Sequence, residues 1–403
     1  MCYFAQAVAV NLSPVLFGVF HRLYHLDLSL LGVLIAVNFV SQLAVDLLCA
    51  PLCRRLGYRA SMSIALVFCA LGMILLGTLV RIWDRAFVAL LIPTVAFSVG
   101  GGMLEVVVSP VADAIAPTRS KGVMGLLFSF YSWGQLLVVL LTSIALTLLQ
   151  DALWYLLPYV WAAVPLGALI ALQTCAYPPQ EPPSDAKRFL LNRYFVLAML
   201  VMLCAGAGEM IVSQWSSLFA ETALQLPKLA GDALGACGFA LCMGIGRLWI
   251  AIKPPRNPDR VLIAAGAMLI VSFAMLSLIP NPYICLLGCS LTGLSVSWMW
   301  PITVSRCAGR FPTAGALMFG LLAVSGDVGC SLGPLLSGVW SEFAMQSPIL
   351  QQLAARTGAS VEQLGMRVGV GACAIFPILL LIALILLAVE QRRRPSPRAD
   401  EPR

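Results

Sequence analysis

Four acidic residues lie within long apolar stretches of this sequence, where a charged side chain is unexpected. They are Asp46, Glu105, Glu209 and Asp327. A carboxylate inside a lipid bilayer costs about 2.5–3.5 kcal/mol on insertion scales, and desolvation disfavours its charged form. An acid that is neutral in one state and ionised in another can carry a proton, so we interpret Glu105 and Glu209 as proton-coupling residues. The alternative is a permanently protonated acid that forms a hydrogen bond between helices.

Polar residues recur at helical spacing beside two of these acids. Asn38 and Gln42 precede Asp46 at intervals of four, and Ser213 follows Glu209 by four. Such a stripe occupies one face of a helix, where it either packs against another helix as a polar contact or lines a path. Tryptophan away from the membrane interface either stacks on a sugar ring or packs in the core. The predicted substrate-binding residues are Asn11, Asn38, Gln42, Gln135, Ser213, Trp298 and Trp300.

Glycine and proline mark positions where helices approach closely or bend. Asp327 stands between glycines in Ser325-Gly-Asp327-Val-Gly329, which favours a role in helix contact or gating. The predicted gating or helix-contact residues are Asp46, Asp327, Gly102, Pro110, Gly293 and Pro301.

The composition predicts that membrane helices position these residues. The chain of 403 residues is 60% hydrophobic and 11% charged, whereas soluble domains carry about 25% charged residues. Its mean hydropathy is +0.93, and a helix needs roughly 20 apolar residues to cross a bilayer. Twelve apolar runs meet this length, at 2–20, 29–50, 60–80, 86–109, 122–149, 153–176, 194–220, 229–251, 260–279, 283–305, 314–340 and 367–389.

The distribution of Lys and Arg predicts the orientation of these spans. With both termini in the cytoplasm, nineteen of the 25 basic residues, Arg247 among them, fall on the cytoplasmic side, as the positive-inside rule requires. No basic residue then remains within the membrane. We expect a multi-pass protein of the plasma membrane, of the bacterial inner membrane type. The first span starts at residue 2, and we expect the sequence to begin late.

A proline-rich, charged segment divides the spans into six and six. We expect an N-terminal six-helix bundle at 1–176, a cytoplasmic linker at 177–193, a C-terminal six-helix bundle at 194–390 and a cytoplasmic tail at 391–403. Gly102 and Pro110 have the same spacing as Gly293 and Pro301. The pairs Gly125 with Gly134 and Gly320 with Gly329 are likewise matched. Such repeats build transporters that rock about a central site.

The acids also predict which helices surround that site. Spans 3, 6, 9 and 12 carry no ionisable residue in their apolar cores, so we expect them to face lipid while the other eight enclose a cavity.

Other classes of function lack the residues they need. The 13 cysteines are scattered singly and the only histidines are His21 and His25, so no metal site, cofactor or catalytic set is predicted. The basic residues lie in membrane connections, which argues against nucleic acid as a partner. The expected partners are a small-molecule substrate, protons and the lipid bilayer, and we expect a monomer.

The motifs resemble the sugar-porter branch of the major facilitator superfamily that contains the fucose permease. Gly102-Met-Leu-Glu105-Val-Val-Val-Ser-Pro110 is similar to that family's glycine, glutamate and proline run. The resemblance implies two pseudo-symmetric bundles and a role for Glu105 in proton-coupled sugar transport. Gly206-Ala-Gly-Glu209 and Ser297-Trp-Met-Trp300-Pro301 are also similar. The family's acid in the first span is replaced by Ser13-Pro14.

We therefore expect a secondary active transporter rather than an enzyme, a proton-coupled symporter that moves a small neutral solute, such as a sugar, by alternating access. Because no cation is predicted within the membrane, an anionic substrate has no obvious partner. The alternative is a proton-driven exporter of cationic or amphipathic compounds, with Glu105 and Glu209 as counter-charges.

Overall fold

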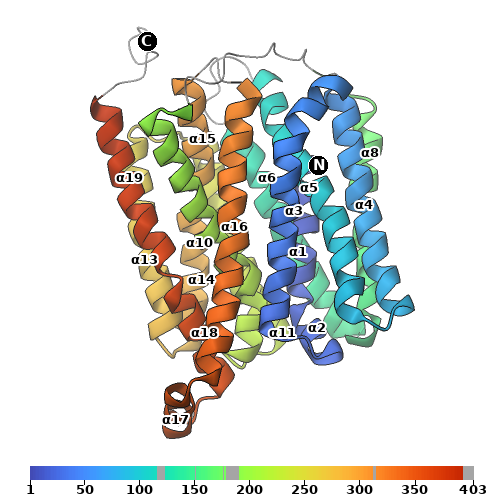
Figure 1. Ribbon diagram of the computed structural model, residues 1–403, viewed down its shortest axis with the longest axis vertical. Helices are drawn as coiled ribbons and strands as arrows, with labels where there is room; N and C mark the ends of the chain where they lie inside the picture. The colour runs from blue at the N-terminus through green and yellow to red at the C-terminus, as the bar shows by residue number, and fades with distance from the viewer. Residues whose placement is uncertain (116–122, 150, 176, 178–189, 312–314, 394–403) are drawn as a thin grey trace.

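The computed structural model describes residues 1–115, 123–149, 151–175, 177, 190–311 and 315–393. Twelve helical segments in this part of the chain are long and apolar enough to cross a membrane, and they stand side by side in Figure 1. Each overlaps one of the twelve predicted runs, which confirms the all-α membrane fold. Residues 178–189 of the predicted linker lie outside the described residues, and so does most of the predicted tail.

The first six spans use eight α-helices and one 3₁₀ helix. In chain order they are α1 (Cys2–Val15) with α2 (Phe17–Tyr24), α3 (Leu28–Leu56), α4 (Tyr58–Ile82), α5 (Ala86–Ile115), α6 (Val123–Leu149), and η1 (Asp151–Leu156) with α7 (Leu157–Trp161) and α8 (Ala163–Leu172).

The second six spans follow the linker. They are α10 (Arg193–Thr222), α11 (Lys228–Gly231) with the π-helical turn η2 (Asp232–Ala236) and α12 (Cys237–Ile252), α13 (Pro258–Leu278), α14 (Pro282–Val296) with α15 (Met299–Arg310), α16 (Gly315–Gln346), and α18 (Val361–Ala372) with α19 (Ile375–Arg393). The segment 341–366, between the last two predicted runs, contains the end of α16 and a short helix, α17 (Pro348–Thr357), which projects below the bundle in Figure 1.

Two spans that contribute to the interior are interrupted. Pro14 cannot donate a backbone hydrogen bond, and the first span breaks at Leu16 between α1 and α2. The tenth span breaks at Ser297 and Trp298, so Pro301 falls in the first turn of α15, where its missing N–H is tolerated. Pro110, its predicted counterpart, lies inside an unbroken α5.

The matched glycines make equivalent contacts in the two halves. A methyl group on Gly102 of α5 would lie 3.0 Å from the Cα atom of Gln42 in the second span, and one on Gly293 would overlap the Phe239 carbonyl of the eighth. Gly134 similarly faces the first span, and Gly329 faces the seventh. Gly320 departs from the pattern because no neighbouring atom lies within 4 Å of its methyl position. The duplication predicted from spacing thus corresponds to repeated helix packing.

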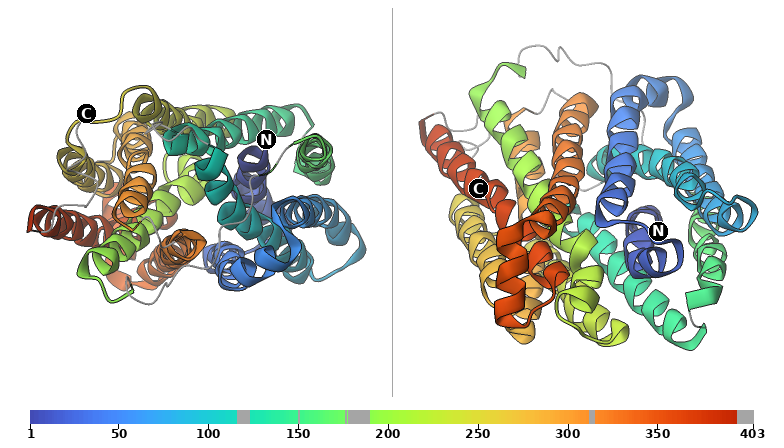
Figure 2. Two further views of the ribbon diagram at one scale, coloured as in Figure 1. Left: turned by 90° about the horizontal axis from the view of Figure 1, so that it is seen from above. Right: turned by 60° about the horizontal axis from the view of Figure 1, so that its bottom comes forward.

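The two halves lie next to each other, blue to green and lime to red, in the view from above (Figure 2). They meet along two seams, α3 against α16 and α6 against α12. On the first seam a methyl group on Gly338 would lie 3.3 Å from the Leu28 carbonyl oxygen, and Ser331 Oγ donates to the Ala36 carbonyl at 3.3 Å. Within a bilayer the hydrophobic effect does not drive helices together, and small residues stabilise the contact by allowing the backbones to approach closely.

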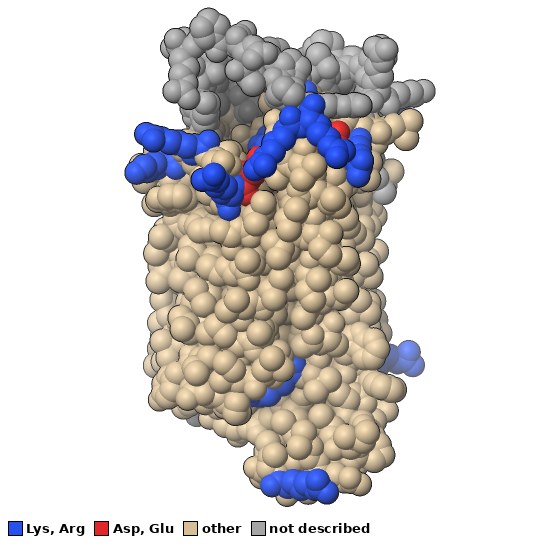
Figure 3. Space-filling view, turned by 90° about the vertical axis from the view of Figure 1, so that its left-hand side faces the viewer, with Lys and Arg blue, Asp and Glu red and all other residues tan. Residues whose placement is uncertain are grey.

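Charged residues are unevenly distributed along the bundle. On the face shown in Figure 3, Lys and Arg gather mostly at the end near the C-terminus, and a broad belt without charged residues lies below it. We call this the basic end and the opposite one the far end. Large apolar side chains of the spanning helices are exposed, such as Ile170 of α8 and Leu278 of α13, as expected of a surface solvated by lipid.

Candidate functional site

A cavity of about 40 Å³ lies between the two halves. It is lined by Tyr3, Gln6, Val10, Phe39, Gln42, Glu105, Phe128, Tyr131, Glu209, Met210, Arg247, Trp300, Asp327 and Cys330. These residues come from α1, α3, α5 and α6 of the first half and α10, α12, α15 and α16 of the second. None comes from spans 3, 6, 9 or 12, which confirms the predicted division. Since one water needs roughly 10–15 Å³ of such space, this conformation admits only a few water molecules.

Glu105 faces the cavity from α5. Its Oε2 accepts a hydrogen bond of 2.7 Å from Gln6 Nε2 of α1. Gln6 is a neutral partner, so it stabilises the carboxyl without cancelling its charge. The first apolar run contains two amides, Gln6 and Asn11, and the prediction included only Asn11.

Glu209 faces the cavity from α10 and has a cationic partner. Its Oε1 lies 3.3 Å from Arg247 Nη2, and both side chains are 3% exposed. The prediction that no basic residue lies within the membrane is therefore wrong for Arg247. A signal was present, because the apolar run continues for five residues from Leu248 to Ile252 before Lys253, which places Arg247 more than one turn inside the helix.

Arg247 also connects the two halves. From α12 its Nη1 donates to the Phe128 carbonyl at 3.2 Å and to Ser132 Oγ at 3.0 Å, both on α6. Its guanidinium lies 5.8 Å from the ring centre of Phe128 and 5.9 Å from that of Tyr131, within the range of cation–π attraction. A buried cation needs such partners.

Five polar atoms of the cavity side chains have no hydrogen-bond partner within the described residues. Three are acceptors, Gln6 Oε1, Glu209 Oε2 and Asp327 Oδ2, and two are donors, Arg247 Nε and Trp300 Nε1. Buried polar groups are usually paired, so these atoms are free to bind water or a solute. The indole nitrogen of Trp300 lies close to the Glu209 carboxyl.

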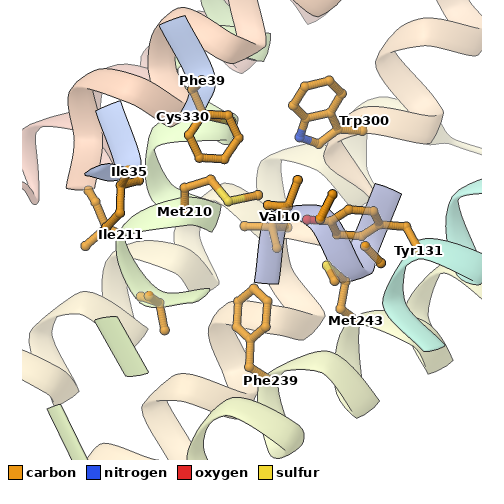
Figure 4. Packing of buried hydrophobic residues seen from close by; sticks show 14 of the residues in the cluster. Val10, Ile35, Phe39, Tyr131, Met210, Ile211, Phe239, Met243, Trp300 and Cys330 are labelled. Atoms are coloured by element: carbon orange, nitrogen blue, oxygen red, sulfur yellow. The ribbon is translucent and has the colours of Figure 1, made fainter. Parts of the chain in front are cut away.

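Aromatic and sulfur-containing side chains form the apolar walls. In Figure 4, Phe39, Met210, Cys330 and Trp300 surround one volume, with Tyr131 to one side. The rings of Phe128 and Trp300 are 6.5 Å apart and tilted. The cavity thus combines flat apolar surfaces with a few polar atoms, the usual composition of a small-molecule site.

Some predicted binding residues lie beside the cavity rather than on it. Asn11 donates to Tyr131 Oη at 3.2 Å and so positions a lining residue. Gln42 lines the cavity, and its Nε2 donates to Asn38 Oδ1 at 3.2 Å. Asn38 Oδ1 also accepts from Ser98 of α5, so Asn38 connects helices.

The remaining predicted binding residues pack elsewhere. Gln135 donates to Ser213 Oγ at 2.7 Å, which joins α6 to α10. Trp298 donates to the Gly246 carbonyl at 3.1 Å and stacks near Trp249. None of these residues lines the cavity, so of the two predicted tryptophans only Trp300 does.

Asp46 and Asp327, predicted as gating or helix-contact residues, meet at the seam between α3 and α16. Both are buried, at 3% and 2% exposure, and their carboxyl groups lie within hydrogen-bonding reach of each other. Within the described residues, no donor reaches either oxygen of Asp46 or Oδ2 of Asp327.

A third charged cluster closes the far end between the halves. Arg22 of α2 lies 2.9 Å from Asp151 and 2.7 Å from Glu221 of α10. Lys228 lies 2.8 Å from Glu221 and 3.2 Å from Asp232. The described residues contain no group of three or more His, Cys, Asp or Glu side chains suited to a metal ion.

Comparison with known proteins gives a family model and several solved structures. The model of the Major Facilitator Superfamily matches residues 1–334, and no curated protein matches by sequence. A bacterial homologue of the human lysosomal transporter Spinster, inward-facing and occupied, is similar with a TM-score of 0.74 at 15% identity, covering 98% of this chain and 97% of that one. The fucose:proton symporter FucP of E. coli has a TM-score of 0.65 at 17% identity, with 96% of each chain covered.

Proposed function

Because the chain belongs to the Major Facilitator Superfamily, we propose that it is a proton-coupled secondary transporter that moves a small neutral solute by alternating access. The observation that carries the proposal is the central cavity. Glu105 faces it with a neutral partner, beside unpartnered donors and acceptors contributed by both halves. A site between two bundles is open to each side in turn when the bundles rock.

The proton role rests on the difference between Glu105 and Glu209. Arg247 neutralises Glu209 in this conformation, whereas a proton is the simplest means of neutralising Glu105. We therefore propose Glu105 as the principal proton carrier. Glu209 takes part when its contact with Arg247 loosens.

The preference for a neutral solute follows from the cavity's charges. Among the described residues the one cation that lines it, Arg247, is already bound to Glu209, so an anionic solute would have to displace a carboxylate. Hydroxyl groups suit the free atoms of Gln6, Arg247 and Trp300, and the indole face suits the apolar side of a sugar ring. The fold shared with a fucose:proton symporter makes L-fucose the first solute to try.

We propose that the basic end faces the cytoplasm of a cell whose plasma membrane holds the protein, with both termini on that side. The support is the excess of Lys and Arg at that end, because cytoplasmic connections are enriched in these residues.

The test is uptake into proteoliposomes with an imposed pH gradient, acid outside. Radiolabelled L-fucose is tried first, then a panel of neutral sugars and polyols, with an internal pH-sensitive dye. Glu105→Gln should abolish accumulation driven by the gradient and retain exchange of labelled for unlabelled solute. Asp84→Asn, an exposed acid at the far end, is the matched control. If Glu105→Gln accumulates solute as the unchanged protein does, the proton role is wrong.

A second function, export of cationic or amphipathic compounds driven by protons, has one observation in its favour. The cavity is lined by three acids, Glu105, Glu209 and Asp327, and by one cation. A susceptibility panel of lipophilic cations on expressing cells tests it. Resistance that Glu105→Gln removes would favour export, and unchanged susceptibility would favour the neutral solute.

A further inference from the structure

The pair formed by Asp46 and Asp327 differs from the other acids of the interior. Asp46 belongs to the first half and Asp327 to the second, and they meet on the α3–α16 seam. From Leu28 to Asp46 this seam follows α3 over 18 residues, or about 27 Å of helix. The close approaches of Leu28 and Ala36 lie toward the far end. Asp46 lies nearer the basic end.

Three of the four carboxyl oxygens of this pair are acceptors without a donor in the described part of the chain. Both oxygens of Asp46 and Oδ2 of Asp327 lack a partner in the described part of the chain. Unsatisfied buried acceptors are costly, and two carboxylates in contact away from water cannot both remain ionised. A hydrogen atom between the two carboxyls would satisfy both conditions.

In the described part of the chain, the groups next to this pair supply no positive charge. α5 presents Glu105, α1 presents Tyr3 and α10 presents Glu209, while α16 itself adds Cys330. All of these are acids or neutral groups. The cation of the cavity, Arg247, is bonded to Glu209 and to α6.

We infer that Asp46 and Asp327 form a second proton-binding site, in which one proton shared by the two carboxyls holds α3 of the first half against α16 of the second. The inference rests on the proposed alternating access driven by protons. It adds a proton at the contact between the halves to the proton proposed at Glu105.

The site couples protonation to opening. When the halves separate at the basic end, water reaches both carboxyls, the shared hydrogen bond breaks and the proton leaves for the solvent. The closed contact binds a proton that the open one lacks, so a rise in pH favours opening. For one proton the ratio of open to closed molecules increases up to about tenfold per pH unit.

The shared proton is tested by infrared spectroscopy on the purified protein. A protonated carboxylic acid has a carbonyl stretch that a carboxylate lacks. We expect Asp46→Asn and Asp327→Asn each to remove the same band at neutral pH, and the double variant to remove no more. Either substitution removes the band because the new amide side chain can donate a hydrogen bond to the remaining carboxylate. That carboxylate then no longer needs the shared proton. The control is Asp27→Asn, an exposed acid at the far end, which should leave the band intact.

Opening is tested with a native thiol. Cys330 lies one turn after Asp327, lines the cavity between the halves and is 2% exposed, so N-ethylmaleimide reaches it only when the halves separate. Labelling of Cys330 is measured by mass spectrometry against exposed Cys175 at a series of pH values. The double variant Asp46→Asn, Asp327→Asn can close through its amides without a proton. Relative to this variant, labelling of the unchanged protein should increase up to about tenfold per pH unit.

Three outcomes would overturn the inference. They are a spectrum in which the two single variants remove different bands, labelling that runs parallel in the unchanged protein and the double variant, and labelling controlled by sodium rather than pH. Neither measurement needs a transported solute. Failure of uptake with a shared proton intact would therefore reject the proposed function, whereas loss of the shared proton with uptake intact would reject only this site.

Discussion

Glu209 and Asp327 line the same cavity from neighbouring helices, but their charges are balanced in different ways. Glu209 has a guanidinium at 3.3 Å, which itself is held by a carbonyl and a hydroxyl of the other half. Asp327 lies instead against another acid, Asp46, and no donor among the described residues reaches either oxygen of Asp46. The charges of the first pair balance each other within the protein, whereas the second pair needs a proton from solution.

This difference indicates separate tasks for the two pairs. A buried ion pair keeps its charges over a wide pH range, so the Glu209–Arg247 pair can fix the geometry of the cavity. The protonation of an acid pair depends on pH, so the Asp46–Asp327 pair can make the contact between the halves depend on pH. Glu105, which has a neutral amide as its partner, lies between these two cases.

The largest effect is expected from breaking the Glu209–Arg247 pair. Arg247→Met should leave Glu209 as an uncompensated buried carboxylate and lower the free energy of unfolding by about 3–5 kcal/mol. Thermal unfolding in detergent measures this loss. Adding Glu209→Gln to the same chain should restore part of it, since no unpaired charge then remains. Equal loss in the single and double variants would show that Arg247 acts through packing alone.

The next effect concerns the acid pair and depends on pH. The closed folded chain holds a proton that the unfolded chain releases at neutral pH, so stability should fall as pH rises, by up to about 1.4 kcal/mol per unit for one proton. The double variant Asp46→Asn, Asp327→Asn should give a flatter profile. Chemical denaturation at several pH values compares them, and profiles of equal slope would contradict the difference drawn between the two pairs.

A third effect is expected at the hydrogen bond between Gln6 and Glu105. Gln6→Leu removes the hydrogen bond to Glu105, and such a bond to a charged group contributes about 1.5–3 kcal/mol, or less if Glu105 is protonated. Stability measured on both sides of neutral pH separates these cases. A loss that grows as pH rises indicates that Glu105 ionises in the folded protein. A loss independent of pH would mean that its protonation state does not change over this range.

The smallest effect is expected at the far end, where the pair between the halves is partly solvated. The Arg22 side chain is 44% exposed, so its attraction to Glu221 is screened and contributes roughly 0.2–1 kcal/mol. Arg22→Gln should therefore change the unfolding temperature little at low salt and still less at high salt. A loss as large as that of Arg247→Met would mean that this network, rather than the buried pair, holds the halves together.

The sequence by itself determined the spans, the eight helices that enclose the cavity and the acids within them. These properties follow from solvation, because a lipid-exposed helix requires about 20 apolar residues and tolerates acids only toward the interior. These solvation requirements apply to each segment separately, so they can be recognised from the sequence of that segment alone. The matched positions of Gly102 and Gly293 were readable for the same reason, since their spacing within each half is local.

Only the tertiary structure decided which partner each acid has. The rotation and depth of α12 bring Arg247 to Glu209, and the packing of α3 on α16 brings Asp46 to Asp327. The break at Ser297 and Trp298 directs Trp300 into the cavity and Trp298 away from it. These outcomes depend on how helices distant in the chain pack together. That packing is set by the combined shapes of many side chains, so the residues of one span cannot reveal it.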